Sequence, residues 1–318
     1  MTYTDNDMSA ILLASHLGLG ENNETKPFSL GEWAKFLHGI KELGLKPDVA
    51  LSSDGAWLNE LGYDEVQKDR VKKLLARGIA VAFALERLED MGIKLVTMFS
   101  REYPILLRKK LQWKTPPVLF YAGNLSLVNK IGIAIVGSRS IDSAGNQFAV
   151  DLTKKAVNEE LMIFSGGAKG VDSVAEKTAL AMNGGVVSYI SDALEARVQK
   201  KDIVKELFSD RLLLLSDVKP DVGFTVARAM NRNKYVYASS YGTFVVQSDY
   251  NKGGTWTGAM EAIKHKYSKT FVWDNAKFIG NMKLIENGGF PYLLNNEGLL
   301  TTINSTEQTT SAKQPNLF

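Results

Sequence analysis

The sequence predicts an α/β fold in which a Rossmann-like, mostly parallel sheet with flanking helices follows a small helical N-terminal domain. Two apolar runs that end in glycine, residues 131–137 (IGIAIVG) and 161–167 (LMIFSGG), indicate buried strands. Helical patterns separate most of the later apolar runs, and such alternation forms right-handed βαβ units and a parallel sheet. Before residue 93, apolar residues recur at helical spacing instead, which indicates the helical domain.

Residues 1–92 are predicted to form short helices joined by turns. An apolar run from Ser9 to Leu17 opens the first helix. Ser29 and Glu32 have the spacing of a capping box, so a second helix is expected to begin there. Further helices are expected at residues 54–61, 63–76 and 80–91, the last of them closed by Gly92.

Residues 93–300 are predicted to form the Rossmann-like domain. Long helices are expected at residues 142–160 and 171–182. Strands are expected at residues 93–97, 118–121, 131–137, 161–167, 186–190, 212–215, 243–247 and 270–273. The polar segment at residues 301–318 has no core pattern and is predicted to be a disordered tail that ends in a peptide motif.

Composition excludes several classes of protein. The chain of 318 residues has no cysteine, which excludes disulfides, thiolate zinc sites and cysteine nucleophiles and fits a cytoplasmic protein. No apolar run is long enough to span a membrane, and the acidic N-terminus lacks the basic region of a secretory signal. The net charge of +3 does not demand nucleic acid, so a basic groove would require local clustering of Lys and Arg.

Two glycine loops follow the first two predicted parallel strands. Ligands of open α/β sheets bind beyond the carboxyl ends of the strands, where glycines admit close approach and helix N-termini attract anions. Arg139 and Lys169 add positive charge there, so these loops predict a phosphate site. The alternative is tight packing by glycines beside solvated cations. The predicted phosphate-binding residues in these loops are Gly137, Ser138, Arg139, Ser165, Gly166, Gly167, Lys169 and Gly170.

Two later segments extend the same pattern. Arg232, Asn233 and Lys234 place an amide between two cations, although a charge run on a surface is normally just solvated. The segment Gly253-Gly254-Thr255 lies in another glycine loop between a predicted strand and a helix. Both segments are therefore added to the predicted phosphate-binding residues.

Taken together, these motifs resemble the DNA-processing protein A family, also called DprA or Smf. The motifs occur in the family's order: Val136-Gly137-Ser138-Arg139, then Ser165 to Asp172, then Arg232-Asn233-Lys234, then Gly253-Gly254-Thr255. The resemblance covers residues 93–292. It implies a single-stranded DNA-binding protein without catalysis of its own, which acts in DNA processing, recombination or uptake (DNA-mediated transformation), helps load a recombinase and self-associates as a homodimer.

The resemblance also implies roles for particular residues. Arg139 and Lys169 match the positions expected to contact the DNA backbone, and Arg232 with Lys234 would extend the rim or order the loop. Asp172 stands at a helix start, where it is expected to cap or orient. The sequence departs from the family pattern where Gly167 replaces a Leu or Met.

The last five residues, QPNLF, resemble the peptide that docks into the hydrophobic pocket of the bacterial β sliding clamp. Leu317 and Phe318 would fill the apolar pocket, and Gln314 would hydrogen-bond beside it. A polar segment before the motif suits a peptide ligand. The alternative is a pentapeptide that matches by chance, since short motifs match often.

Catalytic and cofactor sites are not indicated. The histidines are scattered, metal-ligand spacings are lacking, and neither a P-loop nor a dinucleotide fingerprint occurs. Two alternatives stay open: a Rossmann-like sensor of a nucleotide, and a nucleotide phosphoribohydrolase. The hydrolase loop would need a glutamate where Met260 stands, although Glu261 lies next to it. We therefore expect a DNA-binding protein that is not an enzyme and that has no cofactor, metal or membrane partner.

Overall fold

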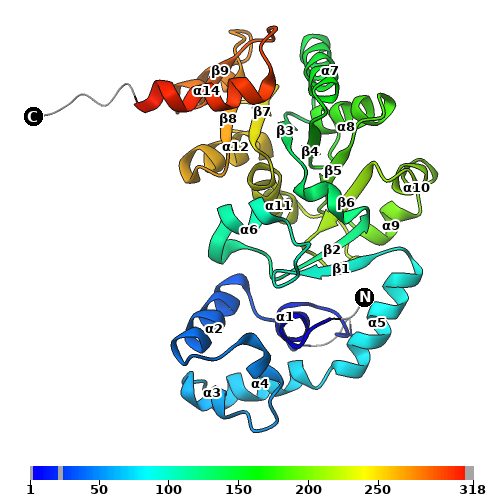
Figure 1. Cartoon of the computed structure of the whole chain (residues 1–318), viewed down its shortest axis with the longest axis vertical. Coiled ribbons are helices and arrows are strands. Elements are labelled where there is room, and N and C mark those ends of the chain that lie inside the picture. Colours follow the sequence, from blue (N-terminus) through cyan, green and yellow to red (C-terminus); the bar gives the residue numbers. More distant parts are fainter. Residues whose placement is uncertain (1–2, 21–23, 312–318) are drawn as a thin grey trace, which may run out of the picture.

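A nine-stranded sheet forms the centre of the computed structural model, which describes residues 3–20 and 24–311 (Figure 1). The strand order is β1-β2-β6-β5-β4-β3-β7-β8-β9. β1 pairs antiparallel with β2, and β2 with β6, whereas the other neighbouring strands are parallel. The strands are β1 (Lys94–Thr97), β2 (Val118–Gly123), β3 (Gly132–Val136), β4 (Met162–Ser165), β5 (Val186–Tyr189), β6 (Leu212–Ser216), β7 (Gly242–Val245), β8 (Lys269–Trp273) and β9 (Phe290–Tyr292).

Helices cover both faces of this sheet because its strands are apolar on both sides. In β3, Ile133 and Ile135 face one core, and Ala134 and Val136 face the other. The predicted fold, a mostly parallel sheet with flanking helices, is confirmed. The first face is covered by α7 (Ser143–Asn158), α8 (Val171–Ala181), α9 (Leu194–Val198) and α14 (Leu299–Ser311), and the second by α6 (Ile105–Leu111), α11 (Val226–Ser239), α12 (Gly253–His265) and α13 (Ile279–Glu286).

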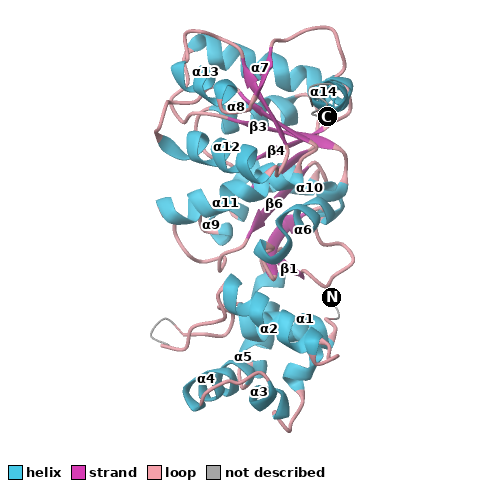
Figure 2. Ribbon diagram, turned by 90° about the vertical axis from the view of Figure 1, so that its left-hand side faces the viewer, coloured by secondary structure: helices cyan, strands magenta, loops and turns pink. Residues whose placement is uncertain are grey.

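The chain before the sheet is helical, and Figure 2 shows these helices below the sheet. Thr4 and Asp7 form a capping box at the start of α1, and the predicted box of Ser29 and Glu32 opens α2. These elements are α1 (Asp5–Ala14), α2 (Leu30–Glu42), η1 (Pro47–Leu51), α3 (Ala56–Glu60), α4 (Glu65–Leu75) and α5 (Gly78–Asp90). The shorter connecting elements of the sheet region are η2 (Gln112–Lys114), η3 (Leu125–Asn129) and α10 (Lys201–Phe208).

Helix α14 corrects one prediction, because the sequence predicts disorder from residue 301. Leu299 and Ile303 are buried, with 0% and 4% of their surface exposed. Ile303 packs on Gly242, where an added Cβ would lie 2.8 Å from its Cδ1 atom. The Lys269 ammonium donates to the Ile303 carbonyl at 2.6 Å, and Glu159 accepts from the Leu299 amide at 2.7 Å. The prediction of disorder is wrong for residues 301–311, because a few apolar contacts hold an otherwise polar helix.

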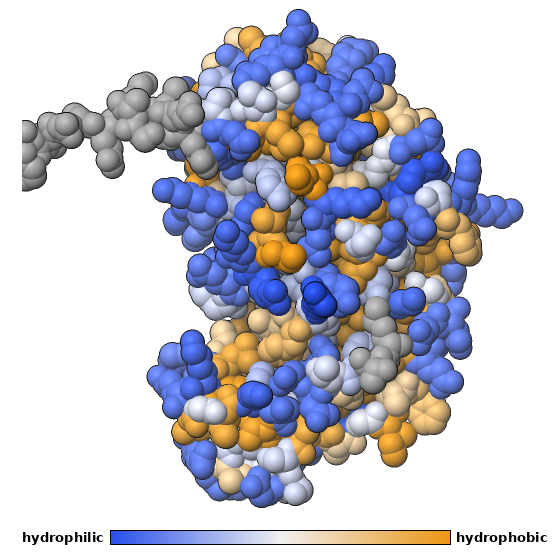
Figure 3. Space-filling view, in the orientation of Figure 1, coloured by the Kyte–Doolittle hydropathy of each residue, from blue (hydrophilic) through white to orange (hydrophobic). Residues whose placement is uncertain are grey.

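One face of the molecule is mostly polar. Hydrophilic residues cover most of the face that Figure 3 shows, with smaller apolar groups between them. Within the described ranges, no helix is both long and apolar enough to cross a membrane. Within the same ranges, no cluster of three or more His, Cys, Asp or Glu residues could hold a metal ion.

Candidate nucleic-acid interface

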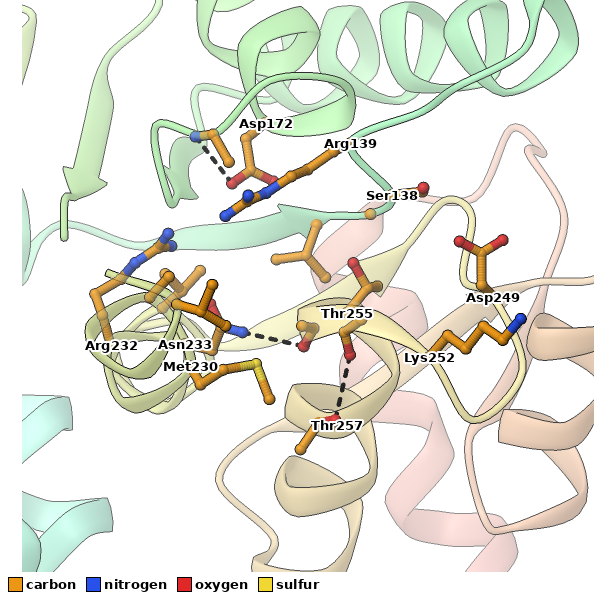
Figure 4. Close-up of a pocket in the computed structure, with 18 of the residues that line it drawn as sticks. Ser138, Arg139, Asp172, Met230, Arg232, Asn233, Asp249, Lys252, Thr255 and Thr257 are labelled. Carbon is orange, nitrogen blue, oxygen red and sulfur yellow. Dashed lines mark hydrogen bonds between the residues drawn. The ribbon is translucent and has the colours of Figure 1, made fainter. Parts of the chain in front are cut away.

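A cavity lies at the carboxyl ends of β3 and β7, where the path of the chain across the sheet reverses. From β3 the chain adds β4, β5 and β6 on one side, and later β7, β8 and β9 on the other. The helices that follow β3 and β7, α7 and α12, cover opposite faces and so leave a crevice between the two strand ends. A cavity of about 510 Å³ occupies this position (Figure 4). The predicted residues that line it are Gly137, Ser138, Arg139, Arg232, Asn233, Gly253, Gly254 and Thr255.

The loops that follow β3 and β4 interlock beside the cavity, and glycines permit this. Gly170 has a φ of +79°, and a Cβ there would lie 2.2 Å from the carbonyl oxygen of Ser138. A Cβ on Gly137 would lie 2.4 Å from a methyl carbon of Val171. The Val171 amide donates to the Ser138 carbonyl at 3.2 Å. Close packing of the two loops thus needs these glycines and brings Arg139 to the cavity.

Arg232 lies in the cavity wall on α11, with only 5% of its surface exposed. Gly166 makes room for it, because a Cβ there would lie 1.6 Å from its Nη1 atom. The Nε atom is buried and has no hydrogen-bond partner among the described residues, which also offer the guanidinium no ion pair. Burial lowers the pKa of Arg232, but an arginine side chain stays protonated in proteins. The wall therefore holds a positive charge that Asp172 and Glu176 attract without forming an ion pair with it.

Arg139 supplies a second guanidinium from the opposite side. Its side chain is exposed and lies 5.2 Å from the centroid of the Phe224 ring. Figure 4 shows this guanidinium extending toward Asp172 and Arg232. Because two like charges face the same space, an anion placed between them would be attracted by both.

Two carboxylates on α8 moderate this positive charge. Asp172 lines the cavity and is 7% exposed, and burial raises its pKa to about 6 against the opposing attraction of Arg232. Glu176, one turn further on, accepts from the Gly167 amide at 2.9 Å and from the Ser188 hydroxyl at 2.7 Å. Burial raises the pKa of Glu176 to about 7. Asp172 is thus largely ionised at neutral pH and becomes neutral in mild acid.

The N-terminus of α12 completes the cavity. Gly253, Gly254 and Thr255 form its first turn. Lys252 is the N-cap residue, and its side chain makes no capping hydrogen bond, so the amides of this turn are uncapped. Asn233 on α11 donates to the Gly254 carbonyl at 3.0 Å, which fixes the two helices to each other. Unpaired amides at a helix N-terminus attract anions. The cavity therefore combines two guanidiniums with a helix end of the same sign.

Several predicted residues lie outside the cavity lining. Ser165 is buried in β4, and its hydroxyl donates to the Ile135 carbonyl at 3.4 Å. The Gly167 carbonyl accepts from Arg197 at 2.9 Å. Gly166 and Gly170 pack against cavity residues as described above, and Lys169 is exposed on the loop between them. These positions shape and flank the cavity.

Lys234 and the C-terminal peptide also lie apart from it. Lys234 is 9% exposed, and its ammonium donates to Asn231 at 2.6 Å and lies 5.3 Å from the Tyr235 ring centroid. It points into this network and is not one of the lining residues. The predicted clamp-binding residues Gln314, Leu317 and Phe318 lie outside the described residues.

Sequence reasoning did not single out one wall of the cavity. This wall consists of α11 side chains at helical spacing, namely Val226, Ala229, Met230, Val236 and Tyr237. The i, i+3, i+4 pattern was available in the sequence, but it becomes informative only when α11 is known to border a ligand site. Asp249, which follows β7, is likewise a lining residue outside every sequence motif, whereas Lys252 stands directly before the predicted glycine loop.

Comparisons of the sequence with known proteins point to one family. A family model described as DNA recombination-mediator protein A matches residues 94–304. DNA processing protein DprA from Bacillus subtilis is 24% identical over 250 residues, which cover 76% of this chain and 83% of the relative. DNA processing protein DprA from Streptococcus pneumoniae is 28% identical over 146 residues, which cover 46% of this chain and 51% of that protein.

Solved structures share the fold. The X-ray structure of DprA from Streptococcus pneumoniae superposes with a TM-score of 0.70 at 19% identity and covers 95% of this chain and 99% of its own. DNA processing protein A from Helicobacter pylori gives a TM-score of 0.54 at 21% identity, and the superposition covers 68% of this chain and 96% of that one. At these identities the structures support the fold alone, whereas the family match extends over most of the chain. This chain is therefore a member of the DprA/Smf family of DNA recombination-mediator proteins.

Proposed function

We propose that this protein binds single-stranded DNA by its phosphates and acts in DNA processing without catalysing a reaction itself. The observation that carries the proposal is the buried guanidinium of Arg232, which has no partner among the described residues and faces Arg139 across the cavity. Asp172 attracts Arg232 but forms no ion pair with it, and a buried charge without a paired counterion is costly, so an anionic ligand would explain why this arginine is buried. Phosphate is the anion that matches arginine in geometry and charge.

The comparisons support DNA as the source of that phosphate. The Helicobacter pylori relative has a structure that concerns its single-stranded DNA binding mode, and this chain shares its fold. Backbone binding does not depend on sequence and requires cations spaced along a strand. We propose that Arg139 and Arg232 contact one phosphate, and that the exposed Lys169 contacts a neighbouring one.

The test is fluorescence anisotropy with oligo-dT that carries a 5′-hydroxyl and a 3′ label, at two salt concentrations. We expect salt-sensitive binding that Arg139→Ala weakens. Loss of one phosphate contact lowers the slope of log affinity against log salt by about 1. Lys169→Ala should lower the slope by a similar amount with a smaller loss of affinity.

Lys177→Ala is the matched control. Lys177 is exposed on α8 and does not line the cavity, so its substitution removes one positive charge away from the site. Its affinity should stay close to that of the wild type. If the control loses as much affinity as Arg139→Ala, general charge explains binding and the cavity is not the site. Absence of wild-type binding at low salt would refute the proposal.

A hydrolase is disfavoured by the position of Glu261. In the phosphoribohydrolase alternative, this residue is the nearest candidate for the required carboxylate. Instead it accepts from the Tyr267 hydroxyl at 3.2 Å and is not a lining residue. Asp172 and Asp249 are the lining carboxylates, so a nucleotide that binds here would meet no glutamate from α12.

We further propose recombinase loading and self-association, which the family membership suggests. Light scattering of the purified chain would test the dimer, and a strand-exchange assay with the cognate recombinase would test loading. A monomer at micromolar concentration would refute self-association. A wild-type rate equal to that of Arg139→Ala would refute a loading role that depends on DNA.

We also propose that Gln314, Leu317 and Phe318 bind the β sliding clamp. Two apolar side chains at the end of a polar segment suit an apolar pocket. Calorimetry of the clamp with the full chain should show binding that Leu317→Ala/Phe318→Ala abolishes. Equal binding by the double variant would overturn the assignment.

A further inference from the structure

Three groups of hydrogen-bond donors border the cavity. Arg232 is 5% exposed and lacks a hydrogen-bond or ion-pair partner among the described residues, Arg139 faces it, and the uncapped end of α12 adds a partial positive charge. Asp172 and Asp249 line the same cavity and offset part of this charge. An internal phosphodiester offers two non-bridging oxygens, whereas a terminal phosphate monoester offers three acceptor oxygens and a charge of about −1.5 to −2 near pH 7.

The dimensions of the cavity suit a small ligand. The inner wall is made of buried residues, namely Val136, Val236 and Tyr237, which are 8%, 1% and 2% exposed. The volume of about 510 Å³ lies in the range of pockets that hold small ligands.

The remaining lining residues suit the nucleoside that a terminal phosphate carries. Val226, Ala229 and Met230 on α11 form an apolar wall that runs from the exposed mouth to the buried interior, with Val226 69% exposed and Ala229 6% exposed. A sugar or base can pack on such a surface while its phosphate lies between the guanidiniums. No hydrogen bond to the hydroxyl of the buried Tyr237 is present in the described part of the chain.

We infer that this cavity binds a terminal phosphate monoester, carried by the end of a DNA strand or by a free nucleotide, in preference to an internal phosphodiester. The inference rests on the proposed function and specifies its ligand. The strand end is received between Arg139 and Arg232, with the α12 amides beside it. The remainder of the strand then leaves through the mouth, past the exposed Lys169.

The experiment compares oligo-dT that differs in a single group. Affinities are measured for 5′-phosphate, 5′-hydroxyl and 3′-phosphate versions, each labelled at the opposite end. We expect one phosphorylated version to bind about tenfold more tightly than the 5′-hydroxyl version, as expected for one additional charge-assisted contact. Arg232→Met should abolish this difference, and Lys177→Ala should preserve it.

Gly166→Ala is a second variant, since an added Cβ would lie 1.6 Å from Arg232 Nη1 and would displace the guanidinium without removing it. It should also abolish the preference for the terminal phosphate. The wild-type chain gives an independent readout, because thymidine 5′-monophosphate should raise its melting temperature more than thymidine does. This readout does not depend on how well either variant folds.

The outcomes separate this inference from the proposed function. Equal, salt-sensitive binding of all three oligonucleotides would overturn the inference and leave single-stranded DNA binding intact. Binding of thymidine 5′-monophosphate with no binding of any oligonucleotide would support the monoester site and overturn DNA as its source. Tighter binding of a phosphorylated oligonucleotide than of the mononucleotide would support both the monoester site and a strand end as its ligand.

Discussion

Two buried arginines in this protein have opposite surroundings. Arg77 is 8% exposed, and its guanidinium donates to the carbonyls of Leu74, Leu17 and Leu12. Arg232 is 5% exposed and has no such partners among the described residues. Arg77 therefore joins the end of α1 and the turn after it to the start of α5. Arg232 is held in place by packing and is available to a ligand.

This contrast predicts different effects of the same substitution. Arg77→Met should lower the free energy of unfolding by roughly 3 kcal/mol, because buried carbonyls lose their donors. Arg232→Met should change it by less than about 1 kcal/mol, since removal of an unpaired buried charge offsets the lost attraction to Asp172. Urea unfolding measures both values. A loss at Arg232 as large as that at Arg77 would show that Arg232 is structural.

Asp172 predicts a pH dependence of DNA binding. Burial raises its pKa to about 6, so it loses its negative charge as the pH falls through that value. The positive field of Arg139 and Arg232 is then less opposed, and we expect affinity to rise roughly three- to tenfold between pH 7.5 and 5. Glu176 and Tyr237 also face Asp172, and Glu176, with a pKa of about 7, adds to the rise because it also attracts Arg232.

The measurement should use the 5′-hydroxyl oligonucleotide, because a phosphodiester does not titrate in this range whereas a monoester does. Asp172→Asn should bind more tightly at pH 7.5 and should show a smaller pH dependence. The folded-state pKa of Asp172 exceeds the ordinary value of 3.8, so the folded state also gains stability as the pH falls from about 6 toward 4. An affinity that falls with pH would contradict this account.

Helix α11 shows why a contiguous motif in the sequence does not stay together in the structure. Neighbouring residues of a helix point about 100° apart. Arg232 and Asn233 therefore line the cavity, while Lys234 points into a network with Asn231 and Asp217. The segment was identified in the sequence as a group of charges, but assigning each side chain to a face required the position of α11 in the fold.

Helix α14 leads to a prediction of its own. Ile303 is 4% exposed and packs on Gly242, so Ile303→Ala leaves a cavity and should lower the free energy of unfolding by roughly 2–4 kcal/mol. Asn304→Ala, an exposed neighbour in the same helix, is the control and should have little effect. Urea titration distinguishes them. Equal stability of both variants would mean that the helix does not contribute to the fold.

Prediction from sequence succeeded where the pattern was local and failed where the contact was distant. The positions of the strand-end glycines could be predicted, because a loop that joins a buried parallel strand to a helix lies at the carboxyl edge of the sheet. The α14 contacts join residues 299 and 303 to Glu159 and Gly242, far away in the chain, and leave only two apolar residues as a signal. The packing of Arg232 against Gly166 is also a contact between distant segments, and no sequence pattern in either segment predicts it.

The helical region and the sheet share one hydrophobic core. Residues of α1 such as Ile11 and Leu13, each 0% exposed, belong to the same cluster as Leu95 of β1 and Phe120 of β2. Polar contacts reinforce the boundary, since Asp7 accepts from the hydroxyls of both Thr97 and Ser100. The division into domains at residues 92 and 93 stays a prediction, and the shared core argues that the two parts are coupled in stability.

Coupling of this kind predicts how the whole chain unfolds. Leu13→Ala removes buried contacts at the boundary and should lower the free energy of unfolding by roughly 2–4 kcal/mol. If the two parts form one cooperative unit, slowly exchanging amides in α2 and in β3 should lose the same amount of protection, because both open only on global unfolding. Native-state hydrogen exchange of wild type and variant measures this for each helix and strand. A loss confined to α1–α5, with β3 and β4 unchanged, would show that the helical region unfolds independently of the sheet that carries the cavity.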